Sequence, residues 1–177
     1  LIRRQRQMCI RDSYASDDQL PEFEDYSMEN RTYRYFRGTP LYPFGYGLSY
    51  TKFNYSGLKL SADSITAGKG VEVQVTVTNT GSCAADEVTE VYVKDMEAST
   101  RVPNCSLCGF AHTHLEAGES KTLHISVQPE AFRLVKEDGS RVYEPGVFTL
   151  YAGGSQPDQR SEKLNGTAVL SAEVAMQ

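Results

Sequence analysis

The sequence predicts an all-β sandwich of about seven short strands, preceded by an extended aromatic arm. Short runs of residues alternate between apolar and polar side chains, which is typical of strands with one buried face. Glycine, proline and asparagine separate these runs at short intervals, as expected of turns. The 177 residues are enough for one domain with a substantial core and an additional arm.

The clearest strand runs from Gly70 to Thr80. Four valines occupy every second position there and alternate with glutamate, glutamine and threonine. This period of two, together with the β-branched side chains, predicts a half-buried strand. The alternation places Val75 on the core face and Thr76 on the opposite face. Asn79, Thr80 and Gly81 then supply a turn.

The same alternation predicts the remaining strands. They are expected around Leu58 to Leu60, Val91 to Val93, Leu107 to Leu115, Leu123 to Val127, Phe148 to Ala152 and Ala168 to Val174. Glu90, Tyr92 and Lys94 alternate with the two valines of the second run and so belong to its other face. Only Pro129 to Val135 is predicted to hold a helical turn.

The chain contains 11 Tyr and 7 Phe, and no Trp. The segment from Arg31 to Tyr55 holds nine of these aromatic residues, which is half of the total. Prolines and glycines in this stretch exclude a continuous helix and interrupt any strand. The stretch is nevertheless too aromatic to stay solvated. Its rings either pack as core or domain contact, or form a stacking platform for sugars or bases. We favour packing, because buried aromatic rings usually serve it.

This stretch also resembles a known family. The motifs PLYPFGYGLSY (40–50), VTVTNTG (75–81), DEVTEVYV (86–93), LCGF (107–110), LEAGESKTL (115–123) and EPGVFTLYAGGS (144–155) occur in the order of the C-terminal fibronectin type III-like domain of family 3 glycoside hydrolases. The resemblance covers roughly residues 22 to 165. It implies a fibronectin type III-like, or immunoglobulin-like, sandwich behind a preceding α/β domain. It also implies a parent enzyme that removes terminal β-linked glucose or xylose with retention.

The resemblance suggests three segments. Residues 1–13 carry Arg3, Arg4, Arg6 and Arg11; they form either a basic arm or a non-native segment that resembles translated sequencing adapter. Residues 14–48, called the arm below, combine an acidic linker with the aromatic stretch. Residues 49–177 form the sandwich.

The resemblance also implies a contact site. Because the aromatic residues precede the first strand, where the chain meets its neighbouring domain, five of them are expected to pack against the preceding catalytic domains. We expect them to remain partly exposed here. The five are Tyr33, Tyr35, Phe36, Tyr42 and Phe44. The alternative is a stand-alone carbohydrate-binding or protein-interaction module, although the chain has no Trp.

No catalytic or cofactor site is predicted. Cys105, Cys108, His112 and His114 have the residue types of a zinc site, but on a strand the two cysteines lie on opposite faces, so no metal is expected. Asp86 and Glu87 are adjacent on a strand, so their side chains diverge. Most acids outside the acidic linker are expected at solvated strand or turn positions; examples are Asp63, Glu72, Asp86, Glu90, Glu116, Glu119, Asp138 and Glu144.

Charge and cysteine content limit the remaining functions. The net charge of −5 argues against nucleic-acid binding, and no apolar run is as long as the about 20 residues of a membrane span. The parent's oligosaccharide substrate is thus the one ligand expected. Four unevenly spaced cysteines do not make a disulfide scaffold. Free thiols and the lack of a secretory signal in this sequence favour a cytoplasmic location.

Overall fold

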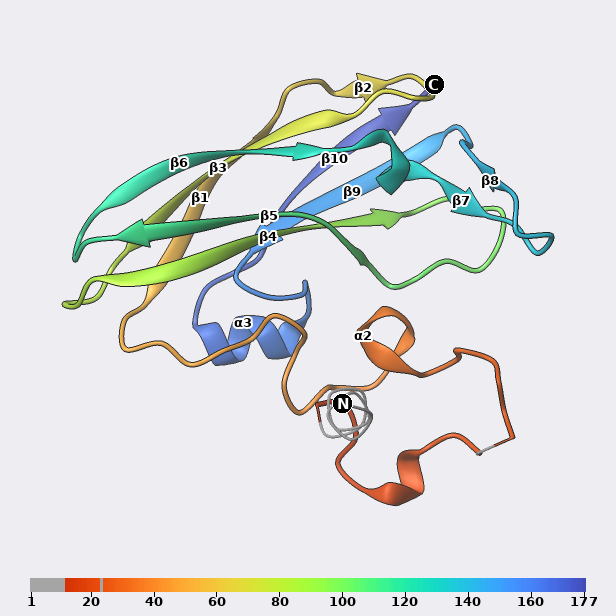
Figure 1. The fold of residues 1–177 in the computed structure, drawn as a ribbon, viewed down its shortest axis with the longest axis horizontal. Coiled ribbons are helices and arrows are strands. Elements are labelled where there is room, and N and C mark those ends of the chain that lie inside the picture. Colours follow the sequence, from red (N-terminus) through yellow and green to blue (C-terminus); the bar gives the residue numbers. More distant parts are fainter. Residues whose placement is uncertain (1–11, 23) are drawn as a thin grey trace.

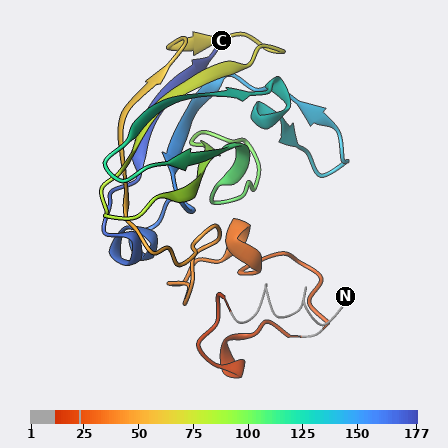
Figure 2. The ribbon, with the colours of Figure 1, turned by 60° about the vertical axis from the view of Figure 1, so that its left-hand side comes forward.

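Two β-sheets pack face to face in the computed structural model, which describes residues 12–22 and 24–177 (Figure 1). The strands are β1 (Phe53–Leu60), β2 (Ser64–Ile65), β3 (Val71–Asn79), β4 (Ala85–Asp95), β5 (Ser106–Leu115), β6 (Ser120–Val127), β7 (Leu134–Val135), β8 (Arg141–Val142), β9 (Gly146–Gly153) and β10 (Leu170–Met176). One sheet has the order β1-β3-β6 and the other the order β2-β10-β9-β4-β5. The β7-β8 hairpin projects from one side of the sandwich (Figure 2).

β3 is the central strand of the three-stranded sheet and pairs antiparallel with β1 and β6. Val75 lies opposite Leu123 of β6, and Val77 lies opposite Tyr55 of β1. All four valines of β3 are buried, whereas Thr76 is partly exposed. The predicted strand and its core face are therefore confirmed.

The hydrophobic core fills the space between the two sheets. The strands of the two sheets contribute residues mainly at alternate positions, because side chains two apart share a face. The predicted all-β sandwich is confirmed by this arrangement. The core includes Phe53, Val71, Val73, Val75, Val77, Val91, Val93, Leu115, Ile125, Val127, Phe132, Phe148, Leu150, Ala152, Val174 and Met176.

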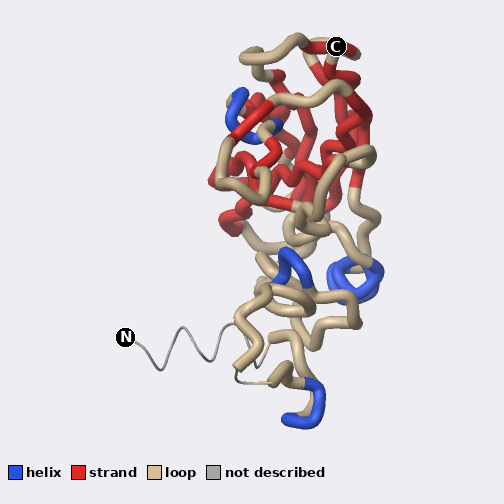
Figure 3. The backbone as a smooth tube through the Cα atoms, turned by 90° about the vertical axis from the view of Figure 1, so that its right-hand side faces the viewer, coloured by secondary structure: helices blue, strands red, loops and turns tan. Residues whose placement is uncertain are grey.

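The arm lies below the sandwich in Figure 1, close to α3 (Gln159–Asn165). Figure 3 shows the strands gathered in one half of the molecule and the loops of the arm in the other. The arm contains two short helical segments, a 3₁₀ turn at Asp17–Gln19 and α2 (Thr32–Tyr35). It is otherwise irregular, as the density of prolines and glycines predicts.

A 3₁₀ turn occurs at Pro129–Phe132, within the range where a helical turn was predicted. The expectation that no other segment could be helical is wrong, because α3 has well-formed ends. Asp158 accepts a hydrogen bond from the Ser161 N–H at 2.6 Å, which caps the first turn. Gly166 ends the helix in the left-handed conformation, with φ 70°. None of the helices in the described part of the chain is long and apolar enough to span a bilayer.

Candidate functional site

The five aromatic residues selected from the sequence line one cavity in the arm. Tyr33, Tyr35, Phe36, Tyr42 and Phe44 surround a space of about 420 Å³, which we call the aromatic hollow. Tyr33 and Phe44 stack with their ring centroids 4.2 Å apart. Tyr42 is 56% exposed, and the other four side chains are partly exposed. The structure thus brings all five together and leaves none of them fully buried.

Hydrogen bonds to the sandwich hold the aromatic hollow in place. The Phe44 N–H donates to Gln156 Oε1 at 3.2 Å, and the Gln156 N–H donates to the Phe44 carbonyl at 2.8 Å. Asn104 donates its backbone N–H to the Arg34 carbonyl at 2.6 Å and its side-chain amide to the Phe36 carbonyl at 2.7 Å. Two loops that follow β4 and β9 therefore fix the arm against the sandwich.

The arm covers the outer face of β4. Tyr92 is fully buried on this face, and the Tyr33 ring meets it edge-on with the centroids 6.4 Å apart. The Tyr92 hydroxyl donates to Glu90 at 2.6 Å. Gly45 passes close to Glu90 with φ +84°, and a Cβ on this glycine would lie 2.1 Å from the carboxylate. The positive φ favours glycine here, because other residues rarely adopt this backbone conformation.

The expectation that Glu90 lies at a solvated position is wrong. Burial beneath the arm raises the pKa of its carboxyl, and the hydrogen bond from Tyr92 offsets this only in part. Strand alternation assigned Glu90 correctly to the outer face. It could not show that the arm would cover that face, because the contact joins residues far apart in the sequence.

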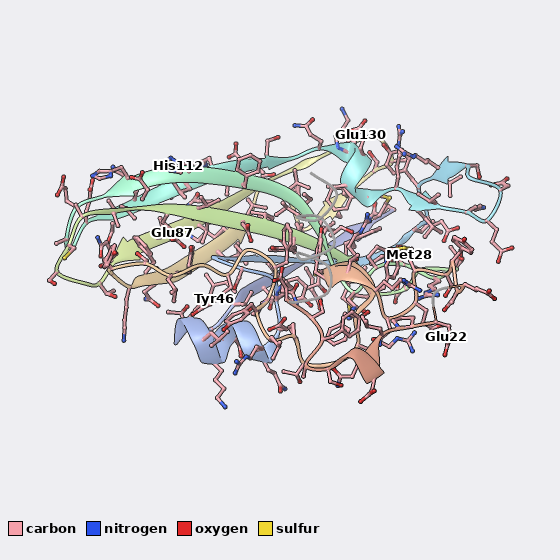
Figure 4. The ribbon with its side chains drawn as sticks, turned by 60° about the horizontal axis from the view of Figure 1, so that its bottom comes forward. Glu22, Met28, Tyr46, Glu87, His112 and Glu130 are labelled. Atoms are coloured by element: carbon pink, nitrogen blue, oxygen red, sulfur yellow. The ribbon has the colours of Figure 1, made fainter. Side chains whose placement is uncertain are left out.

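A second half-buried carboxyl belongs to Glu87, which points between the two sheets. The Tyr55 hydroxyl of β1 donates a hydrogen bond to Glu87 from the opposite sheet, and burial raises the pKa of both groups. Glu87 borders a cavity of about 390 Å³ that Tyr46 also lines (Figure 4). Glu87 and Glu90 lie three residues apart on one strand, so their side chains are on opposite faces.

The residues of the zinc motif do not converge. Burial raises the pKa of Cys105 and of Cys108 to about 12, so both thiols stay protonated at neutral pH. The Cys108 thiol donates to a carbonyl of β4 at 3.3 Å. His112 and His114 lie on the exposed face of β5, where both contact Asp86. No three potential ligands in the described ranges, 12–22 and 24–177, form a metal-binding group.

Three residues that hold the arm were not among the sequence candidates. Gln156 follows Gly153, Gly154 and Ser155, and no sequence signal shows that its side chain reaches the arm. Tyr92 carries a weak signal, because a large aromatic ring on the outer face of a strand suggests that another segment covers that face. Gly45 lies between two aromatic residues in the sequence, and a glycine in this position is consistent with close approach of its backbone to another segment.

We expect Glu87→Gln and Glu90→Gln to reduce the pH dependence of stability. Burial raises the pKa of both carboxyls in the folded state. Their contribution to stability is therefore complete below the unfolded pKa of about 4.3 and is lost as pH rises through the folded pKa. Urea unfolding should show that each variant loses less stability between pH 4 and pH 7 than the unsubstituted chain does. A loss equal to that of the exposed control Glu137→Gln would contradict the burial of these carboxyls.

Comparison with known proteins identifies the sandwich. A family model described as a fibronectin type III-like domain matches residues 87–156. These residues run from the start of β4 to Gln156 and so include the outer face that the arm covers. The chain carries a fibronectin type III-like domain.

Sequence relatives of this fibronectin type III-like domain are parts of much longer proteins. It is 37% identical over 155 residues to a xylan 1,4-beta-xylosidase of Xylanibacter ruminicola, with 87% of this chain and 18% of the relative aligned. It is 36% identical over 151 residues to a beta-glucosidase of Bacteroides ovatus, with 84% of this chain and 20% of the relative aligned. The chain thus spans about a fifth of the length of these curated relatives.

Solved structures agree with this assignment. A β-glucosidase from Erythrobacter marinus superposes with a TM-score of 0.69 at 28% identity, over 94% of this chain and 19% of that chain. A β-glucosidase from Listeria innocua superposes with a TM-score of 0.64 at 30% identity, over 90% of this chain and 20% of that chain. Because the coverage exceeds the sandwich, the likeness includes much of the arm as well.

Proposed function

We propose that this domain is a non-catalytic structural module of a family 3 glycoside hydrolase that removes terminal non-reducing β-D-glucosyl or β-D-xylosyl residues with retention. The observation that carries the proposal is the aromatic hollow, a set of five rings held in place by the sandwich yet incompletely covered. Relatives several times longer than this chain supply the domains that would cover it. The reaction itself is proposed from those relatives.

The carboxyl groups of the domain support a non-catalytic role. Retaining hydrolysis requires two carboxyl groups about 5 Å apart on either side of the scissile bond. Burial raises the pKa of three acids of β4: Asp95, which ends the strand, and the pair Glu87 and Glu90. Glu87 and Glu90 point to opposite faces of the sheet. Each already accepts a hydrogen bond from a tyrosine, Tyr55 or Tyr92. They cannot act together on one glycosidic bond.

In this proposal the chain is divided by function. Residues 49–177 form the sandwich, and residues 14–48 form the arm, whose aromatic hollow packs against the preceding catalytic domains. Residues 1–11 lie outside the described residues, and the proposal assigns them no role. Asp12 and Ser13 lie against the arm, where the Tyr42 N–H donates to the Asp12 carbonyl at 2.9 Å. Incompletely covered apolar surface of this kind marks an interaction site.

Two methionines provide a test of the docking role. Met28 borders the aromatic hollow and is 46% exposed, whereas Met96 lies at the end of β4 and is 50% exposed (Figure 4 labels Met28). We expect hydrogen peroxide to oxidise both at similar rates in this chain alone. In the full-length enzyme, recovered from the upstream coding sequence, we expect Met28 to be protected and Met96 to react as before. Mass spectrometry of proteolytic peptides measures both rates.

The opposite pattern would contradict the docking proposal. If Met28 reacts in the full-length enzyme as fast as it does in this chain, the preceding domains do not cover the hollow. Equal protection of Met28 and Met96 would show a general slowing of oxidation. That outcome also contradicts a contact centred on the hollow.

A further inference from the structure

A groove beside the aromatic hollow collects arginines in an otherwise acidic molecule. Arg34, Arg101, Arg133 and Arg141 line a cavity of about 500 Å³ between the arm, β4 and the β7-β8 hairpin. Residues 12–177 contain 14 basic and 23 acidic side chains, which gives a net charge of −9. Four arginines around one cavity therefore form a positive cluster in a segment of negative net charge. We call this cavity the arginine groove.

Most of these guanidinium groups have no carboxylate partner. In the described part of the chain, Arg34, Arg133 and Arg141 form no ion pair within 4.0 Å, and residues 1–11 and 23 contain no Asp or Glu. Arg101 approaches Glu29 at 3.8 Å, where both side chains are substantially exposed. The groove therefore has unused capacity for an anion.

Two of the arginines are held by aromatic rings. The Arg101 guanidinium lies 5.3 Å from the centroid of Tyr35, and that of Arg133 lies 5.0 Å from the centroid of Tyr143. Such stacking orients a guanidinium and leaves its N–H edge free to donate. A planar donor fork of this kind matches a carboxylate in two-point contact.

The groove also contains apolar surface and hydrogen-bond acceptors. Its apolar lining includes the buried residues Val93, Leu134 and Phe148 and the exposed residue Val135. Two carboxyl groups, those of Asp95 and Glu130, line the same cavity (Figure 4 labels Glu130). A dense anion such as a polyphosphate or a polyglutamate segment would meet repulsion from these two acids. A ligand with one carboxylate, several hydroxyl donors and C–H faces fits all of the lining groups.

We propose that the arginine groove binds an acidic saccharide through the carboxylate of a hexuronic acid residue. The arginines contact the carboxylate, while Asp95 and Glu130 accept hydrogen bonds from ring hydroxyls. The apolar lining packs against the C–H face of the sugar. This role goes beyond the docking proposed above. Arg34 and Tyr35 line both cavities, whereas Arg133 and Arg141 line only the arginine groove.

The test is a calorimetric titration of the purified chain with trigalacturonate and with its methyl ester, which keeps the ring hydroxyls but has no carboxylate. We expect the acid to bind at least about tenfold more tightly than the ester, from the loss of a charge-assisted contact. In Arg133→Gln/Arg141→Gln we expect binding of the acid to weaken by a similar factor. Neither arginine lines the aromatic hollow, and thermal melting checks that the variant is folded. The control Lys59→Gln removes one exposed positive charge on β1, and we expect it to bind normally.

Several results would overturn the proposal. These are the absence of trigalacturonate binding at millimolar concentration, equal binding of acid and ester, and an affinity that the double variant leaves unchanged. Octaglutamate is the remaining comparison. If it binds as tightly as trigalacturonate and loses affinity in the double variant, the groove recognises an acidic protein segment and the saccharide assignment is wrong.

Discussion

Val75→Asp is expected to prevent folding. Val75 is fully buried in the middle of β3, the central strand of its sheet, and lies opposite Leu123. An aspartate there would place a charge among apolar side chains with no partner. Such a change costs more than about 4 kcal/mol, against a total stability of about 5–15 kcal/mol for a typical domain. Loss of the cooperative thermal transition, with little soluble expression, is the expected observation.

The adjacent residue provides the control. Thr76 is on the opposite face of β3, is partly exposed, and its hydroxyl lies 3.0 Å from that of Thr122. Thr76→Asp should lose this contact, at a cost of about 1 kcal/mol, and keep the fold. Equal effects of the two substitutions on thermal melting would mean that the register is wrong by one residue.

Tyr92→Ala is expected to have the second-largest effect. The ring of Tyr92 is fully buried between β4 and Tyr33, although it lies on the outer face of the sheet. Truncation removes the surface on which the arm rests and leaves a cavity, at a cost of about 3–5 kcal/mol by analogy with other buried aromatic residues. Chemical denaturation should show this loss. Limited proteolysis should show faster cleavage within residues 24–48.

The conservative variant separates packing from hydrogen bonding. Tyr92→Phe keeps the ring and removes only the hydroxyl that donates to Glu90, so about 0.5–1.5 kcal/mol should be lost. The arm should stay protected from protease in this variant. If Tyr92→Ala is as mild as Tyr92→Phe, the arm does not depend on this face of β4.

Local sequence patterns were sufficient to predict the sandwich. In β3 a valine at every second position specifies both the strand and its buried face, because side-chain direction in a strand depends only on parity. The divergence of Asp86 and Glu87 follows from the same rule, and the structure shows it directly: Asp86 contacts His114 and Glu87 contacts Tyr55. Both features depend only on residues that are neighbours in the sequence, so they can be predicted from it.

Contacts between distant segments were not predictable in this way. The burial of Glu90 and Tyr92 depends on the arm crossing β4, and the position of the arm depends on Gln156, more than a hundred residues from Phe44. α3 was missed for a different reason. It has only seven residues, too few to show a helical period, although its caps at Asp158 and Gly166 are recognisable signals.

The central claim is that this domain supports catalysis by other domains and performs none itself. The most direct test is to incubate the purified chain with 4-nitrophenyl β-glucoside and 4-nitrophenyl β-xyloside and to follow nitrophenolate release. We expect no release above a blank without protein, because the half-buried carboxyl groups of Glu87 and Glu90 point to opposite faces of β4. Turnover above the blank that is abolished by Glu87→Gln or Glu90→Gln would contradict the claim.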